Sequence, residues 1–127
     1  MSTGQTPLRV LVVEDEFIIA DEIASIIEGA GHTVLGPFGS VAEALAGLER
    51  TTPDFAVIDA SLRGQTSAPV GKRLRALGVP FCVCTGYRLD DLRPSFGEVT
   101  VVAKPVRARA IVDLLDAAAR DARRSDG

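Results

Sequence analysis

The chain has 127 residues and a formal net charge of −3, so it is long enough for one domain with its own hydrophobic core and short for two. A small negative charge gives no overall basic field, and we expect no nucleic-acid partner. No apolar run reaches the length of a membrane span, and the polar residues 1–7 do not resemble a secretory signal, so we expect no membrane partner.

Five apolar runs in the sequence predict β-strands. They cover residues 8–13, 33–37, 55–59, 79–85 and 99–103. The third run is Phe-Ala-Val-Ile before Asp59, and such a continuous run is typical of a parallel strand buried on both faces. The fourth run contains Cys82 and Cys84, which lie too close along one strand to pair well as a disulfide. We expect both cysteines to be reduced core residues of a cytoplasmic protein.

Apolar residues at helical spacing fill the gaps between the strands. The first helix follows residue 16 and closes at Gly31, a residue type that often ends helices. Ser40 and Glu43 have the spacing of a capping box, which predicts the start of the second helix. Pro69 fits only the first turn of the third helix. His32 lies between Gly31 and a strand, and we expect it to be a surface histidine without a role.

The last third of the chain is less regular. Within residues 87–98, Pro94 and Gly97 leave room for one or two helical turns, which predicts a short or irregular fourth helix. A final helix carries apolar residues between positions 111 and 118, and residues 121–127 are predicted to form a polar, frayed tail.

Strands that alternate with helices, over connections of about a dozen residues, predict parallel crossovers. We therefore predict a single α/β domain over residues 8–120, with a doubly wound five-stranded parallel sheet. A disordered N-terminal tail, residues 1–7, and the polar tail, residues 121–127, would flank it.

Parallel strands bring their carboxyl ends to one edge of the sheet, where ligands bind in such folds. The polar residues at these ends are Glu14, Asp15, Asp59, Thr85 and Lys104. Three crowded carboxylates repel one another unless a cation neutralises them, and an all-oxygen set suits Mg²⁺. A metal-bound carboxylate beside a lysine and a hydroxyl can take a phosphoryl group, with Asp59 as the nucleophile.

These residue types at these strand ends resemble the receiver domain of two-component response regulators, which has a flavodoxin-like fold. The resemblance implies that Glu14, Asp15 and Asp59 bind Mg²⁺, and that Ser61 offers its backbone carbonyl to the same ion. It also implies that Asp59 is the phosphoacceptor, supplied by a histidine kinase or a histidine phosphotransfer protein.

Four further positions bear on the comparison with receivers. Thr85 matches the switch hydroxyl, and Lys104 matches the invariant lysine, whose bond to the following Pro105 is usually cis. Most receivers carry an aromatic switch residue three positions before that lysine, and here the position is Val101. Tyr87 follows Thr85 by two residues, and we expect it to take part in the switch.

The absence of that aromatic residue is a feature of the FATGUY receivers, a subgroup linked to general stress signalling. Their motif is Phe-Ala-Thr-Gly-hydrophobic-Tyr, and their fourth helix is poorly formed. In this chain Thr85, Gly86 and Tyr87 fit the motif, whereas Val83, Cys84 and Arg88 depart from it. The resemblance to the subgroup therefore rests on the Thr-Gly-Tyr run, the weak fourth helix and the missing aromatic residue.

The predicted function is that of a stand-alone receiver, which signals through protein contacts or drains phosphoryl groups from a pathway. On this prediction the chain is not an enzyme beyond its own phosphorylation and dephosphorylation. One alternative is a Mg²⁺-dependent phosphohydrolase with Asp59 as nucleophile, although the acids Glu14, Asp15 and Glu16 lack the Asp-x-Asp spacing of haloacid-dehalogenase-type enzymes. A second alternative is an interaction module that works without phosphorylation.

Overall fold

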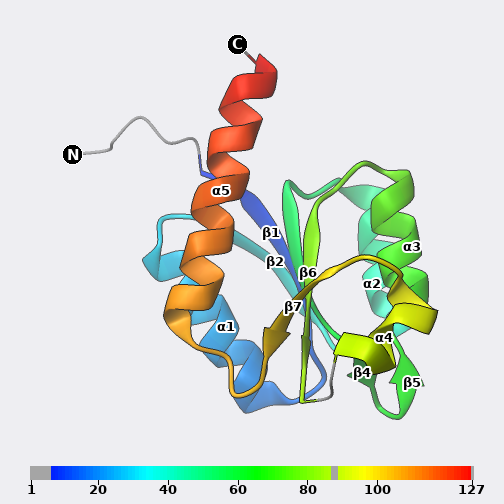
Figure 1. Cartoon of the computed structure of the whole chain (residues 1–127). Coiled ribbons are helices and arrows are strands. Elements are labelled where there is room, and N and C mark those ends of the chain that lie inside the picture. The colour runs from blue at the N-terminus through cyan, green and yellow to red at the C-terminus, as the bar shows by residue number, and fades with distance from the viewer. Residues whose placement is uncertain (1–6, 87–88, 127) are drawn as a thin grey trace.

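A computed structural model of the chain describes residues 7–86 and 89–126. Five parallel strands form one sheet in the order β2-β1-β3-β6-β7. The strands are β1 (Arg9–Val13), β2 (Thr33–Phe38), β3 (Phe55–Asp59), β6 (Phe81–Thr85) and β7 (Thr100–Ala103). The helices are α1 (Phe17–Gly29), α2 (Val41–Arg50), α3 (Ala68–Ala76), α4 (Leu89–Phe96) and α5 (Ala108–Asp126). The predicted doubly wound α/β fold with a five-stranded parallel sheet is confirmed (Figure 1).

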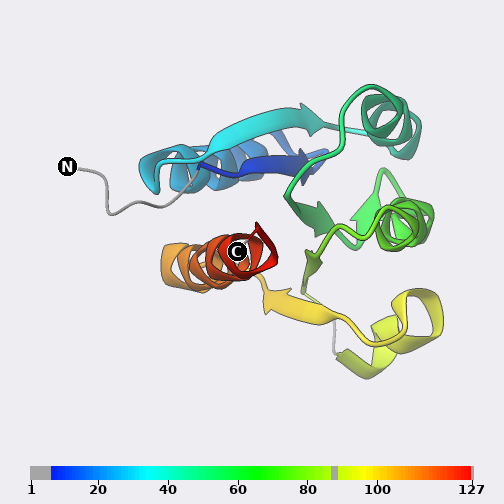
Figure 2. The ribbon, with the colours of Figure 1, turned by 90° about the horizontal axis from the view of Figure 1, so that it is seen from above.

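The sheet is covered by helices on both faces (Figure 2). Helices α1 and α5 lie on one face over a core that includes Val57, Cys82 and Ile111. Helices α2, α3 and α4 lie on the other face over a core that includes Ile58 and Phe96. All five residues of β3 are buried because this central strand contacts both cores. None of the described helices is both long and apolar enough to cross a membrane.

Local sequence signals set several helix ends as predicted. Ser40 caps α2, because its hydroxyl accepts a hydrogen bond from the Glu43 backbone N–H at 3.1 Å. Pro69 lies in the first turn of α3. The short fourth helix is confirmed, since α4 has eight residues and contains Pro94. It ends before Gly97, whose positive φ of 67° is the left-handed conformation that closes many helices.

The segment after Asp59 forms a small antiparallel hairpin that the sequence did not predict, in which β4 (Ser61–Leu62) pairs with β5 (Gln65–Thr66). Two expectations from sequence were wrong. The expected frayed tail after residue 120 is helical, since α5 continues to Asp126 and extends past the sheet (Figure 1). His32 is buried rather than exposed, and its Nδ1 accepts a hydrogen bond from the Leu8 backbone N–H at 2.9 Å.

Candidate functional site at the carboxyl edge of the sheet

The strand register brings the predicted residues together at one edge. Val13 of β1 pairs with Ile58 of β3, so Glu14 follows β1 at the level of Asp59. On the other side of β3, Asp59 pairs with Cys84, which places Thr85 one residue further along β6. Thr85 in turn pairs with Ala103 of β7, and Lys104 follows directly. Backbone pairing between the strands therefore fixes where these residues lie along the edge.

Lys104 connects two of the carboxylates. Its Nζ donates hydrogen bonds to Asp59 Oδ2 at 2.8 Å and to Glu14 Oε1 at 3.2 Å. The backbone of Lys104 is anchored as well, since its N–H donates to the Thr85 carbonyl at 2.9 Å and its bond to Pro105 is cis, as the receiver resemblance implied. Burial lowers the pKa of Lys104, but its contacts with Asp59 and Glu14 outweigh this effect and the pKa is raised. The ammonium is therefore charged at neutral pH.

Glu14 is the most deeply buried of the three acids, with 3% of its surface exposed. Burial raises its pKa from 4.5 to about 7, and repulsion from Asp59 adds to this effect, while the Glu16 backbone N–H and Lys104 oppose it. At neutral pH this carboxyl group is therefore only partly ionised without a cation. A divalent cation would favour its ionised form.

Each of the three carboxylates also accepts one backbone N–H. Glu14 Oε2 accepts from Glu16 at 3.0 Å, and Asp59 Oδ1 accepts from Ser61 at 3.2 Å. Asp15 Oδ2 accepts from Arg63 at 3.1 Å, across the gap between β1 and the β4–β5 hairpin. These contacts orient all three side chains within the cluster.

The residues present fit a magnesium ion. Glu14, Asp15 and Asp59 each offer an oxygen, and these oxygens lie within 4.8 Å of one another. Hard oxygen donors from a few carboxylates, completed by water, are the ligands that Mg²⁺ takes in proteins. The predicted acidic set is therefore assembled by the fold.

The other predicted residues lie around this cluster. Thr85 is buried at the carboxyl end of β6. Ser61 begins β4, two residues after Asp59, and its N–H contacts the Asp59 carboxylate. Val101, at the usual aromatic position, is half-buried and packs against the core on the face that α2, α3 and α4 cover. Tyr87 lies outside the described residues, and its role stays a prediction.

The sequence interpretation missed two residues that hold the site. Ser67, the residue before α3, is fully buried and its hydroxyl donates to the Asp59 backbone carbonyl. A serine just before Ala-Pro predicts a helix cap, but the hydroxyl makes no cap bond because it is turned towards Asp59. Arg63 was missed because Arg-Gly is not one of the usual residue pairs of a hairpin turn.

No protein-family model matches the chain. The transcriptional regulatory protein PdtaR of Mycobacterium tuberculosis is 26% identical over 112 residues, which cover 87% of this chain and 55% of PdtaR. The sensory transduction protein RegX3 of Mycolicibacterium smegmatis is 35% identical over 117 residues, which cover 87% of this chain and 50% of RegX3. The chain thus spans about half the length of these curated relatives.

A solved structure agrees with the sequence relatives. The response regulator PhyR from Brucella abortus superposes with a TM-score of 0.79 and 26% identity, over 96% of this chain and 51% of PhyR. The homologues and structural neighbours are response regulator receiver domains, and this chain has their five-stranded receiver fold.

Proposed function

We propose that the chain accepts a phosphoryl group on Asp59 from a histidine kinase or a histidine phosphotransfer protein. The observation that carries this proposal is the position of Lys104, with its Nζ 2.8 Å from Asp59 Oδ2 and 3.2 Å from Glu14 Oε1 inside a cluster of three carboxylates. A carboxylate that is desolvated on one side and paired with a fixed ammonium is suited to attack phosphorus.

The transfer balances as an exchange of one bond for another. An Asp59 oxygen forms the new P–O bond while the P–N bond to the donor histidine breaks, and that histidine takes the electron pair and then a proton. Lys104 stays charged and lies close enough to neutralise a phosphoryl oxygen on Asp59. Thr85, at the end of β6, would hydrogen-bond another oxygen.

Glu14, Asp15 and Asp59 would hold the Mg²⁺, together with the backbone carbonyl of Ser61. When bound, the ion would supply positive charge to the oxygens of the phosphoryl group in transfer.

Exposed apolar residues beside the cluster support a protein as phosphoryl donor. Phe17 and Ile18 at the start of α1 are 84% and 73% exposed, and they are the only large apolar side chains so exposed among the described residues. A cleft of about 300 Å³, lined in part by Glu14, Asp15 and Phe17, connects Phe17 to the site. Apolar residues in such a position favour contact with a partner surface.

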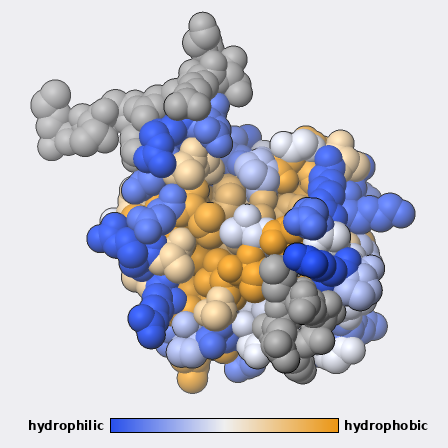
Figure 3. All heavy atoms as spheres, viewed as in Figure 1, coloured by the Kyte–Doolittle hydropathy of each residue, from blue (hydrophilic) through white to orange (hydrophobic). Residues whose placement is uncertain are grey.

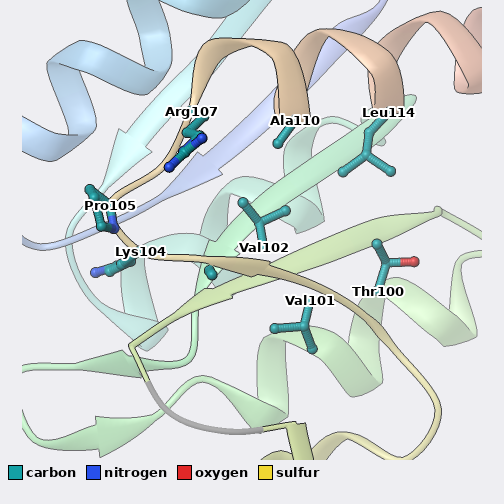
Figure 4. A pocket seen from close by; sticks show the side chains of 9 residues that line it. Thr100, Val101, Val102, Lys104, Pro105, Arg107, Ala110 and Leu114 are labelled. Atoms are coloured by element: carbon teal, nitrogen blue, oxygen red, sulfur yellow. The ribbon is translucent and has the colours of Figure 1, made fainter.

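A second apolar surface favours signalling through protein contacts. A groove of about 440 Å³ lies between β7 and α5, and its lining includes Val101, Val102 and Leu114 (Figure 4). Hydrophobic surface is visible in the middle of this face of the molecule (Figure 3). Lys104 lines one end of the groove, so the surface is continuous with the phosphoacceptor site. We propose contact with a downstream protein here, with a phosphate-sink role as the alternative.

We propose membership of the FATGUY subgroup, and with it general stress signalling, from Val101 and the eight-residue α4 with its internal Pro94.

A cytoplasmic location is proposed from the free, buried Cys82 and Cys84. The hydrogen bond with Cys84 and burial raise the pKa of the Cys82 thiol well above its usual value, which suppresses the reactive thiolate.

Phosphotransfer from a panel of autophosphorylated histidine kinases tests the proposed function. We expect acid-labile label in the presence of Mg²⁺, loss of label with a chelator, and loss of label in Asp59→Asn. Asp113→Asn is the matched control, because Asp113 lies on α5 with 65% of its side chain exposed and should be labelled normally. Label that persists on Asp59→Asn would overturn the assignment. Steady hydrolysis of small phosphate esters would instead favour the phosphohydrolase alternative.

A further inference from the structure

The β4–β5 hairpin carries a backbone conformation that its sequence does not favour. Its two loop residues, Arg63 and Gly64, have φ values of 51° and 80°, the positive pair that a two-residue hairpin turn of this kind requires. Glycine adopts such values freely, but within the described part of the chain Arg63 is the one residue other than glycine with a positive φ. A residue that its surroundings hold in a disfavoured conformation is a candidate for a function.

The conformation of Arg63 directs its backbone N–H towards the carboxylate cluster. This N–H donates to Asp15 Oδ2 at 3.1 Å, although the two residues are 48 positions apart. The guanidinium group extends beside Gly39, where an added Cβ would lie 3.4 Å from Arg63 Nη2 and 3.9 Å from the Asp15 Cα. The tip of the hairpin thus contacts the loop that follows β1 and the loop that follows β2.

The position of the Asp15 carboxylate depends on the Arg63 N–H more than the positions of Glu14 and Asp59 depend on the backbone N–H groups that they accept. Glu14 and Asp59 each accept a backbone N–H and also bind the Lys104 ammonium. Over residues 7–86 and 89–126, the Arg63 amide is the only donor that contacts the Asp15 carboxylate. Asp15 is also only half-buried, so without this hydrogen bond its side chain is free to rotate into solvent.

The hairpin is rigid enough to hold Asp15 in place. Leu62 of β4 is 1% exposed and belongs to the hydrophobic core. At the base of the hairpin, the Ser67 hydroxyl donates to the Asp59 carbonyl and the Ser67 N–H donates to the Ala60 carbonyl at 3.0 Å. The segment from Asp59 to Ser67 is therefore closed at its base by the hydrogen bonds of Ser67, and its tip contacts Asp15.

We propose that Arg63 is a positioning residue for Mg²⁺, and that its backbone amide orients the Asp15 carboxylate towards Asp59 before the ion arrives. The inference rests on the Mg²⁺ site proposed above. The requirement is for a positive φ and a backbone N–H at position 63, and not for a guanidinium group. Residues that orient metal ligands commonly change metal affinity by about 10-fold to 100-fold when they are altered.

A pair of substitutions separates the backbone conformation from the charge. Asn adopts a positive φ readily, whereas the β-branched Val opposes it, and both remove the positive charge of Arg63. We expect Arg63→Asn to bind Mg²⁺ within about threefold of the parent and Arg63→Val to bind about tenfold more weakly than Arg63→Asn. The measurement is a titration with Mg²⁺ alone, followed by amide chemical shifts, which also report whether each variant is folded.

The same pair in an Asp15→Ala background tests whether the effect acts through Asp15. There we expect Arg63→Val and Arg63→Asn to bind Mg²⁺ equally, since the carboxylate that the hairpin orients is gone. Equal affinities of the two variants in the parent background would overturn the inference while leaving the Mg²⁺ site intact. A difference that persists in the Asp15→Ala background would also overturn it. A parent protein that fails to bind Mg²⁺ would overturn both the inference and the proposed metal site.

Discussion

The buried Glu14 should make the metal-free protein less stable as the pH rises. Its pKa is about 7 in the folded protein and 4.5 when unperturbed. Between these two values the folded chain binds more protons than the unfolded chain, so the free energy of unfolding falls as pH rises through this window. Because the pKa is raised from 4.5 to about 7, the free energy of unfolding falls by about 3 to 4 kcal/mol across the whole window.

The substitution Glu14→Gln removes this ionisation with little change of shape. The two carboxylate oxygens of Glu14 accept hydrogen bonds from the Glu16 N–H and from Lys104 Nζ. Gln keeps only one of these acceptor oxygens, and the stability that is lost in this way is the same at every pH. We therefore expect the stability of Glu14→Gln relative to the parent to rise by about 3 kcal/mol between pH 4.5 and pH 8. Lys104 stays charged throughout, because its pKa is raised from an ordinary value of 10.5.

Urea unfolding of both proteins in a chelator, at several pH values, measures this difference directly. All other titrating groups are shared, so their contributions cancel when the two curves are subtracted. A difference that stays constant within about 1 kcal/mol from pH 4.5 to pH 8 would refute the reasoning. Mg²⁺ at about 100 times its dissociation constant should restore roughly 2.7 kcal/mol to the parent, and it should stabilise Glu14→Gln less.

Two further predictions concern packing. Phe96, the last residue of α4, is 2% exposed, and its ring lies against Gly71 of α3. Phe96→Ala should therefore cost about 3 kcal/mol in urea unfolding, and a loss below about 1 kcal/mol would show that α4 contributes little to the core. His32→Leu should cost about 1–3 kcal/mol because it leaves the buried Leu8 N–H without its acceptor, and the Leu8 amide should then exchange its hydrogen faster. Unchanged exchange at Leu8 would contradict the role that the structure gives to His32 as the acceptor of this N–H.

The fold was predictable because its determinants are local or repeat along the chain. The apolar run before Asp59 gave β3 with its observed ends, since a strand buried on both faces needs no pairing information to be recognised. The site was predictable for a related reason: in a parallel sheet, each polar residue at the carboxyl end of a strand reaches the same edge. Glu14, Asp59 and Lys104 came together through strand order and register alone.

The features that were missed depend on contacts between distant segments. His32 follows a turn and looks like a surface residue, but Leu8, 24 positions away, supplies the N–H that it accepts. The turn at Arg63 is favoured by a partner 48 positions away, and a single arginine gives no sign of a positive φ. Residues 121–126 were expected to fray because they are polar, yet they continue a helix that is already formed, and extending a helix is much easier than starting one.

The anchoring of α4 bears on how a signal would leave Asp59. The end of the helix is fixed, because Phe96 is buried and Arg75 Nη2 donates to the Glu98 carbonyl at 2.6 Å. The Arg75 guanidinium also lies 5.4 Å from the centre of the Phe81 ring, which ties this end of α4 to β6. With Val101 in place of an aromatic residue, β7 offers no ring that could follow a movement of Thr85. A response to phosphorylation that reorders the end of α4 would have to break the contacts of Phe96 and Arg75. These contacts therefore oppose a signal that leaves Asp59 by reordering the end of α4.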